Sequence, residues 1–216
     1  MSSLSYMFKN VAKCSSLVMK LHTNQGPAKK KYATVGFARC GNVFINRKFR
    51  FDFEDEWMTQ THHSAGMASL VAKRGTKTLV IVRNPVDCVL SNKVANTELS
   101  IFAIYFSYIL FLLRVRAIKN ITIIDFEDVV GDTEKFKSIA DTFLVTRDHT
   151  TLPTSEVVKQ SILNDRPQDG NRLFLSAPTQ EKREKKALYQ SEVESHYLCY
   201  CACFVYRKLL QKSSLI

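Results

Sequence analysis

The chain has 216 residues, a mass of 24.7 kDa and a formal net charge of +11, which suits one compact domain with a short extension. With 45% hydrophobic residues and few Gly or Pro, it cannot be collagen-like, mucin-like or wholly disordered. The apolar uncharged stretch over residues 99–113 is shorter than the roughly 20 residues that a membrane-spanning helix needs, so we expect a buried helix there.

The positive charge is concentrated at the start of the chain. The first 51 residues contain ten Lys and Arg residues and no acidic one, whereas the sequence from Asp52 onward is nearly neutral. Such a segment favours anionic partners: a phosphorylated small molecule, a polyanion such as RNA or a sulfated glycan, or an anionic membrane surface. A solvated basic tail is the alternative. We therefore divide the chain into a basic N-terminal extension, residues 1–31, and an α/β domain, residues 32–216.

Targeting signals and cysteines indicate a reduced, cytoplasmic protein. Residues 1–20 are Ser-rich and free of acids but lack the Arg enrichment of an organelle transit peptide, which is kept as the alternative. Six cysteines without a C-x-x-C pair predict free thiols. Cys199, Cys201 and Cys203 are closely spaced, but only the outer two share a helical face, so core packing is favoured over a metal site.

Strands and helices are expected to alternate after the extension. Three short apolar runs, typical of buried strands in a parallel sheet, cover residues 32–37, 78–82 and 121–124. Residues 41–48 are expected to form the start of a helix, and further helices are expected over residues 86–94, 99–117, 132–144 and 179–211. Residues 146–177 are expected to be mostly loop. This order predicts a three-layer α/β sandwich with a central parallel sheet, which binds ligands at the carboxyl ends of its strands.

The first strand leads into a loop with the frame of a phosphate-binding loop. Gly36 and Gly41 have the G-x-x-x-x-G spacing directly before a predicted helix N-terminus. Asn42 and Val43 stand where an ATP or GTP site needs Lys and Ser or Thr, which disfavours an ATPase or GTPase. The cation lies inside the loop instead, as Arg39, whose guanidinium can bind an anionic oxygen through two hydrogen bonds. A plain tight turn is the alternative.

The second strand also ends on a cation, Arg83. Pro85 makes the following turn rigid, and Ser91 lies about two turns into the next predicted helix. An arginine and a hydroxyl in this arrangement can bind a second phosphate. The alternative is that Arg83 forms a buried ion pair with Asp125 or Asp128.

These segments resemble sulfotransferases. VIVRNPVDCVLS is similar to the segment of that family that holds the 3′-phosphate of 3′-phosphoadenosine 5′-phosphosulfate (PAPS), in which Arg-Asn-Pro precedes Asp and Ser at this spacing. Ala38-Arg39-Cys40-Gly41-Asn42-Val43 resembles the family's 5′-phosphosulfate loop, usually Pro-Lys-Ser-Gly-Thr-Thr.

Two further elements resemble the same family. Thr61-His62 is similar to the Lys-Thr-His element that carries the catalytic base, with Gln60 in place of the lysine. Phe126 stands at the Tyr of a Tyr-Glu-Asp-Leu segment, where it would border the adenine. The resemblance covers about residues 32–144. The family's later Arg-Lys-Gly loop has no clean counterpart, residues 170–172 (Gly-Asn-Arg) being the nearest.

The resemblance implies a P-loop NTPase-like sulfotransferase fold and transfer of a sulfonate from PAPS to a hydroxyl or amine, with a sugar, glycan or peptide favoured as acceptor and no metal required. His62 would be the base, with His63 as the alternative, and Arg39 would stabilise the leaving group. The residues expected to hold the cofactor are Arg39, Cys40, Gly41, Asn42, Val43, Arg83, Ser91 and Phe126. The rival hypotheses are a nucleotide or nucleoside kinase, a non-catalytic polyanion-binding module and a catalytically inactive relative.

Overall fold

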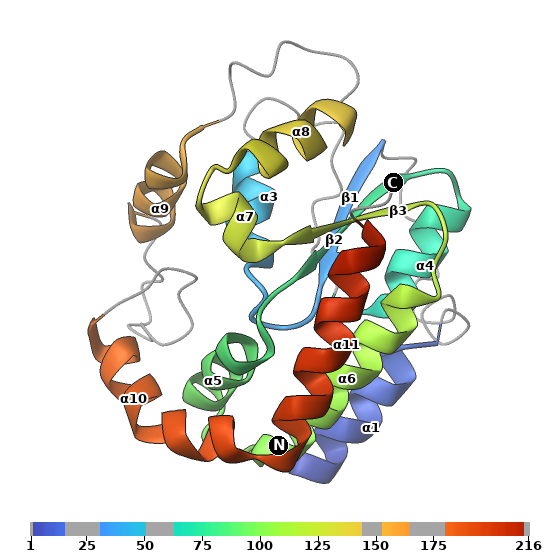
Figure 1. Ribbon diagram of the computed structural model, residues 1–216. Coiled ribbons are helices and arrows are strands. Elements are labelled where there is room, and N and C mark those ends of the chain that lie inside the picture. The colour runs from blue at the N-terminus through green and yellow to red at the C-terminus, as the bar shows by residue number, and fades with distance from the viewer. Residues whose placement is uncertain (1, 16–30, 51–62, 144–152, 165–179, 214–216) are drawn as a thin grey trace.

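The computed structural model describes residues 2–15, 31–50, 63–143, 153–164 and 180–213. Figure 1 shows that helices surround a small parallel sheet in these ranges, so the predicted α/β arrangement is confirmed. All three predicted strands are present, each within one residue of its expected ends.

The sheet has the order β1-β2-β3, formed by Tyr32–Gly36, Lys77–Val82 and Ile121–Asp125. Both strand pairs are parallel, with Gly36 opposite Ile81 and Val82 opposite Asp125. The carboxyl ends of the three strands therefore meet at one edge. β1 and nearly all of β2 are buried, as expected for strands covered by helices on both faces.

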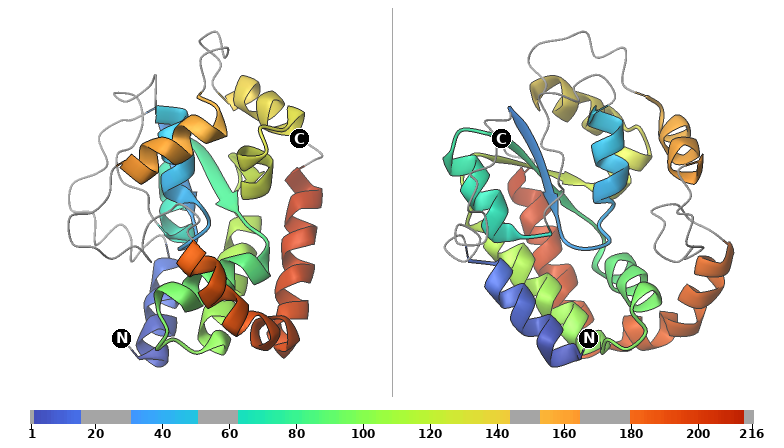
Figure 2. Two further views of the ribbon diagram at one scale, coloured as in Figure 1. Left: turned by 90° about the vertical axis from the view of Figure 1, so that its left-hand side faces the viewer. Right: turned by 180° about the vertical axis from the view of Figure 1, so that it is seen from behind.

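Helices cover both faces of the sheet (Figures 1 and 2). On one side lie α3 (Asn42–Arg50) and α8 (Glu134–Phe143), joined by the packing of Phe49 on aromatic rings of α8. On the other side lie α4 (Ala65–Lys73), α6 (Ile101–Arg116) and α11 (Tyr197–Ser213). The apolar α6 is largely buried between its neighbours, which confirms the buried helix expected there.

The remaining helices surround this framework. They are α1 (Ser3–Lys13) against α6, α5 (Pro85–Ala95) after β2, the short α7 (Phe126–Val130) after β3, α9 (Ser155–Asn164) beside α3, and α10 (Gln180–Ser195) on α5. None of the helices in the described ranges has the length and apolar character to span a bilayer. All six cysteines are free thiols, as predicted.

Two of the expected elements are wrong. The single helix over residues 179–211 is broken at His196 into α10 and α11, because the His196 ring stacks on Tyr105 at 5.5 Å and its Nδ1 accepts the Leu198 amide at 3.2 Å. Within the expected loop 146–177, whose other parts mostly lie outside the described residues, residues 155–164 form α9. Part of the expected extension also folds, since Tyr6 of α1 joins the hydrophobic core.

The fully buried Lys48 connects α3 to the end of α7 and to the start of α9. Nζ of Lys48 donates to the carbonyl of Val129 at 3.0 Å and to Oγ of Ser155 at 2.9 Å, and it forms an ion pair with Asp132. The ammonium also lies 4.6 Å from the centroid of the Phe136 ring. Burial lowers the pKa of Lys48, and the hydrogen bond that the ammonium donates to Asp132 raises it in opposition. This contact fixes the helix that begins at the candidate site.

Candidate anion-binding site

A cavity of about 160 Å³ opens at the carboxyl ends of β1 and β2, the edge where parallel sheets bind their ligands. Its walls come from four separate parts of the chain. The residues that line it are Ala38, Arg39, Gly41, Asn42, Val43, His63, Arg83, Ser91 and Phe126. Seven of the eight residues predicted to hold the cofactor are among them, and the eighth, Cys40, is buried behind the loop.

The loop between β1 and α3 needs its glycine. Arg39 and Gly41 have φ angles of 67° and 85°, in the left-handed region that favours Gly. A Cβ atom added to Gly41 would fall on the ring of Phe126, so no other residue fits without moving that ring. The loop therefore turns sharply and passes directly into the N-terminus of α3, whose first amides have no acceptor within the helix.

Asn42 holds this loop from the inside. Its buried side chain donates from Nδ2 to the carbonyls of Phe37 and Gly36, at 2.9 and 3.2 Å. The same Nδ2 lies 2.8 Å from Nδ1 of His63. Oδ1 of Asn42 is buried with no hydrogen-bond partner among the described residues. The amide thus joins the end of β1, the loop and the histidine in one cluster.

His63 is the histidine that lines the cavity. Its Nδ1 lies 3.2 Å from the Gly36 carbonyl as well as 2.8 Å from Nδ2 of Asn42. With Nδ1 unprotonated the ring accepts from Asn42, and with Nδ1 protonated it donates to Gly36 and leaves Nε2 able to take a proton. His62, the base chosen from the sequence, lies outside the described residues. The sequence offered two adjacent histidines and only a motif match to choose between them.

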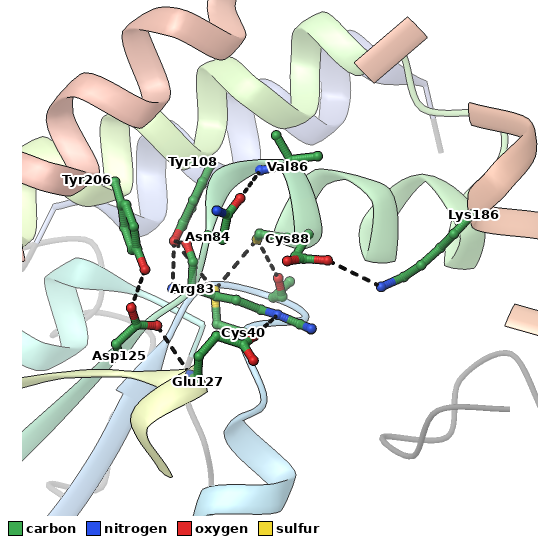
Figure 3. A network of polar contacts seen from close by, with 12 residues as sticks. Cys40, Arg83, Asn84, Val86, Cys88, Tyr108, Asp125, Glu127, Lys186 and Tyr206 are labelled. Atoms are coloured by element: carbon green, nitrogen blue, oxygen red, sulfur yellow. Dashed lines mark hydrogen bonds and ion pairs between the residues drawn. The ribbon is translucent and has the colours of Figure 1, made fainter. Parts of the chain in front are cut away.

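Arg83 extends from the end of β2 toward α7, as Figure 3 shows. Its backbone is fixed by Tyr108, whose hydroxyl donates to the Arg83 carbonyl at 2.6 Å and accepts from its amide at 3.0 Å. The guanidinium carbon lies 4.6 Å from the Phe126 ring centroid, and Nε lies 3.5 Å from Oε1 of Glu127. The side chain therefore packs on the aromatic ring at the wall of the cavity.

The ion pairs expected for Arg83 under the alternative interpretation are not formed. Asp125 instead accepts a hydrogen bond from the hydroxyl of Tyr206 and caps α7 by accepting the Glu127 amide at 3.3 Å. Asp128 pairs with Lys135 at 2.6 Å. The carboxylate near Arg83 is that of Glu127, whose side chain is more than half exposed, so its pairing in solvent is weak. In the described part of the chain, no buried acid therefore neutralises Arg83.

The two predicted arginines face one cavity. The pKa of Arg39 is lowered chiefly by burial; the nearby Cys88 thiol acts in the opposite sense, and the positive charge of Arg83 lowers it further. The charge of Arg83 thus makes the Arg39 guanidinium less stable as a cation. An anion bound between them would relieve both the repulsion and part of the desolvation.

A second lobe of about 250 Å³ adjoins the first and shares Arg83, Ser91 and Phe126 with it. Lys159 from α9 and Lys182 and Lys186 from α10 add three cations to its wall. Sequence reasoning missed this group. Positions 182 and 186 are four apart on one helical face, but only the tertiary packing of α10 on α5 brings that face to the strand edge.

The pKa values of Lys182 and Lys186 of α10 are both lowered. Burial, then the charges of Arg39 and Lys186, lower the pKa of Lys182 to about 8. Burial and Arg83 lower the pKa of Lys186, whereas Asp87, with Oδ1 3.8 Å from Nζ, raises it. Among the described residues, five cations therefore line the two lobes, and neighbouring positive charges lower the pKa values of three of them, Arg39, Lys182 and Lys186. A polyanionic ligand is the natural counterpart of such a site.

The other predicted residues have distinct positions. The Cys40 thiol is buried, 3.6 Å from that of Cys88, and packs the loop against the first turn of α5. Asn84 caps that helix by accepting the Val86 amide at 3.0 Å, which sets the direction in which Ser91 follows Arg83. Residues 170–172 lie outside the described ranges. In the described part of the chain no cluster of side chains suits a metal ion.

Comparison with known proteins adds no relative. No protein-family model matches the chain, and no curated protein matches it significantly in sequence. The functional interpretation therefore depends on the geometry of the two-lobed cleft and on the motifs that line it.

Proposed function

We propose that the chain is a PAPS-dependent sulfotransferase with the P-loop-like fold of that family, which transfers a sulfonate to a hydroxyl or amine of a sugar, glycan or peptide. One observation carries this proposal: Arg39, Arg83 and Ser91, from segments far apart in the sequence, line one cleft at the carboxyl ends of adjacent strands. Their motifs are those that resemble the two phosphate-binding segments of the family.

The two lobes suit a doubly phosphorylated nucleotide. Arg39 and the N-terminus of α3 would bind the 5′-phosphosulfate in the first lobe, and Arg83 with Ser91 would bind the 3′-phosphate where the lobes join. Phe126, which already packs on Arg83, would border the adenine. A kinase fits less well, because Asn42 follows the loop glycine and its amide points inward to backbone carbonyls.

The chemistry requires a base and a cation. The acceptor oxygen attacks sulfur while the bond from sulfur to the 5′-phosphate oxygen breaks, and the electron pair stays on that phosphate oxygen. Arg39 would stabilise the developing charge, a contribution worth roughly 3 to 4 kcal/mol in comparable sites. The acceptor proton would pass to Nε2 of a histidine: His62 by the family motif, or His63, whose place in the cavity supports this role.

Thermal shift with adenosine 3′,5′-bisphosphate tests the cofactor site. At 100 times its dissociation constant the nucleotide should stabilise the protein by about 2.7 kcal/mol, and Arg83→Ala should abolish most of this gain. Arg116→Ala, at an exposed position of α6, is the matched control and should keep it. No shift with the bisphosphate, or an equal shift in the Arg83 variant, contradicts the assignment; stabilisation by magnesium ATP alone would favour the kinase.

Sulfonate transfer from labelled PAPS tests the catalytic role. His62→Ala and His63→Ala should both keep the bisphosphate shift, and one of them should lose transfer by about 10² to 10⁴-fold, the usual contribution of a general base. Full activity in both variants would remove histidine from the mechanism. Binding without transfer in the wild-type chain, across a panel of sugar and peptide acceptors, would favour the catalytically inactive relative.

A further inference from the structure

Three helices that lie side by side share an unusual composition. Figures 1 and 2 show α6 between α1 and α11, which both pack against it. These three helices together contain no Asp or Glu. In the described part of the chain, nine of the twelve exposed large hydrophobic residues lie on them. We call the exposed residues of α1, α6 and α11 the acid-free face.

The apolar part of this face forms stripes along the helices. On α1, Leu4, Phe8 and Val11 are exposed at the i, i+4, i+7 spacing of one helical side. On α6, the ring of Phe102 stacks near that of Phe106, with centroids 6.1 Å apart, and lies 6.4 Å from the ring of Tyr197 at the start of α11.

The stripe continues along α11. Tyr200 and Phe204 are exposed three and seven positions after Tyr197, on the same side of the helix. Exposed apolar residues are common one at a time, but a concentration of rings on adjacent helices marks an interaction surface.

Cations accompany the apolar stripes. Lys9 of α1, Arg114 and Arg116 of α6, and Arg207 and Lys208 of α11 are all exposed. Acidic residues begin only beyond the helix ends, as with Glu98 before α6. The ammonium of Lys208 lies 5.9 Å from the Phe204 ring centroid, so cation and apolar groups are interleaved on one helix. The described residues of the three helices therefore offer apolar rings and positive charge with no acidic side chain among them.

We propose that the acid-free face docks on an anionic lipid surface. Helices that lie in the plane of a membrane combine Phe, Leu and Tyr side chains, which enter the boundary between headgroups and acyl chains, with Lys and Arg that contact anionic headgroups. Complementary charge selects this occupant over a second copy of the chain, because two acid-free faces would repel each other. The surface is separate from the nucleotide cleft, so this proposal does not depend on the enzymatic one.

Co-sedimentation of the full chain with lipid vesicles tests the proposal. The chain should bind vesicles of phosphatidylcholine with phosphatidylserine, bind those of phosphatidylcholine alone far less, and lose binding as salt rises. Lys9→Gln and Arg207→Gln should each weaken partitioning about fivefold, the effect of one charge at an anionic surface. Lys137→Gln, which removes an exposed charge on α8, is the matched control and should bind as the wild type does.

The apolar contribution needs its own variants. Phe8→Ser and Tyr200→Ser should each reduce binding about tenfold or more, whereas Leu188→Ser, at a residue that is 78% exposed on α10, should not. Unchanged thermal midpoints would show that the variants fold. No binding to phosphatidylserine vesicles at low salt, equal losses in the control variants, or a concentration-dependent dimer that Tyr200→Ser disrupts would each overturn the proposal.

Discussion

Lys182 should make binding of the proposed nucleotide depend on pH. Its side chain lies in the second lobe of the cleft, only 8% exposed, and burial with the charges of Arg39 and Lys186 lowers its pKa to about 8. A bound phosphate favours the ammonium form of the lysine. Affinity should therefore be greatest below pH 8 and fall as pH rises through that value.

The size of the effect follows from the fraction of Lys182 that is protonated. With a pKa of about 8, this fraction falls from roughly nine-tenths at about pH 7 to roughly one-tenth at about pH 9, so the dissociation constant should rise about tenfold. Stability without nucleotide should change in the opposite direction. Between about pH 8 and pH 10.5, the ordinary pKa of lysine, Lys182 is protonated in the unfolded chain but not in the folded one. Its contribution to the free energy of unfolding therefore increases with pH in this range.

Calorimetric titration with adenosine 3′,5′-bisphosphate across this range measures both affinity and proton uptake. The wild type should take up close to one proton near pH 9, and Lys182→Met should bind more weakly at pH 7 with a flat profile from this group. Lys185→Met is the matched control: its lysine is on the same helix but exposed and paired with Glu181 at 3.0 Å. Two results would refute the role of Lys182: a dissociation constant that does not change with pH in the wild type, or an equal loss of the pH dependence in both variants. Urea unfolding without nucleotide tests the lowered pKa of Lys182 separately from the nucleotide assignment. If the free energy of unfolding shows the expected pH dependence but the bisphosphate does not bind, the pKa is correct and the proposed ligand is wrong.

Two further changes test the framework of the cleft. Gly41→Ala should lower the free energy of unfolding by at least about 1 to 2 kcal/mol, measured by urea denaturation, because of its positive φ and because its Cβ would fall on Phe126; a neutral effect would contradict the loop geometry. Asp132→Asn should cost about 1 to 3 kcal/mol by leaving the buried Lys48 ammonium without its ion pair, less than for a fully buried pair because the Asp132 side chain is 38% exposed, and adding Lys48→Met should recover part of that loss. Additive effects in this double-mutant cycle would disprove the coupling. Desolvation would raise the pKa of Asp132, but the hydrogen bonds from Lys48 and the Ser155 backbone lower it on balance. The contribution of Asp132 to the free energy of unfolding should therefore be complete above the ordinary pKa of an aspartate and disappear as pH falls through the lowered value.

The sheet was predictable because its strands carry their own signal. A buried parallel strand is a short apolar run, and residues 78–82 and 121–124 have that pattern whatever surrounds them. α4 has no comparable signal. Its Gly66 is required by a neighbour distant in sequence, since a Cβ there would lie 2.7 Å from the carbonyl oxygen of Lys13. The break at His196 likewise depends on the ring of Tyr105, which no local pattern reveals.

The cations of the cleft fall into two groups for a similar reason, one predicted from the sequence and one not. Arg39 and Arg83 each follow a strand directly, so the parallel topology alone brings them to one edge. Lys182 and Lys186 reach the same cleft through a long connection and the packing of α10 on α5, and charged residues on a helix are usually solvated. Motifs beside strands could therefore be found from sequence, whereas cations supplied by a distant helix could not.

Asn42 explains why the cleft needs cations from several elements. A hydroxyl at this position could turn toward a bound anion, but the Asn42 amide donates to the carbonyls of Phe37 and Gly36, so it stabilises the loop and not the ligand. Binding in the first lobe then depends on Arg39 and the N-terminus of α3, and in the second on Arg83 and the lysines of α10. A ligand with negative charge at both ends gains from all of these groups together, whereas a single phosphate meets only some of them. The distribution of charge, more than any one motif, therefore favours a nucleotide phosphorylated at two separate positions.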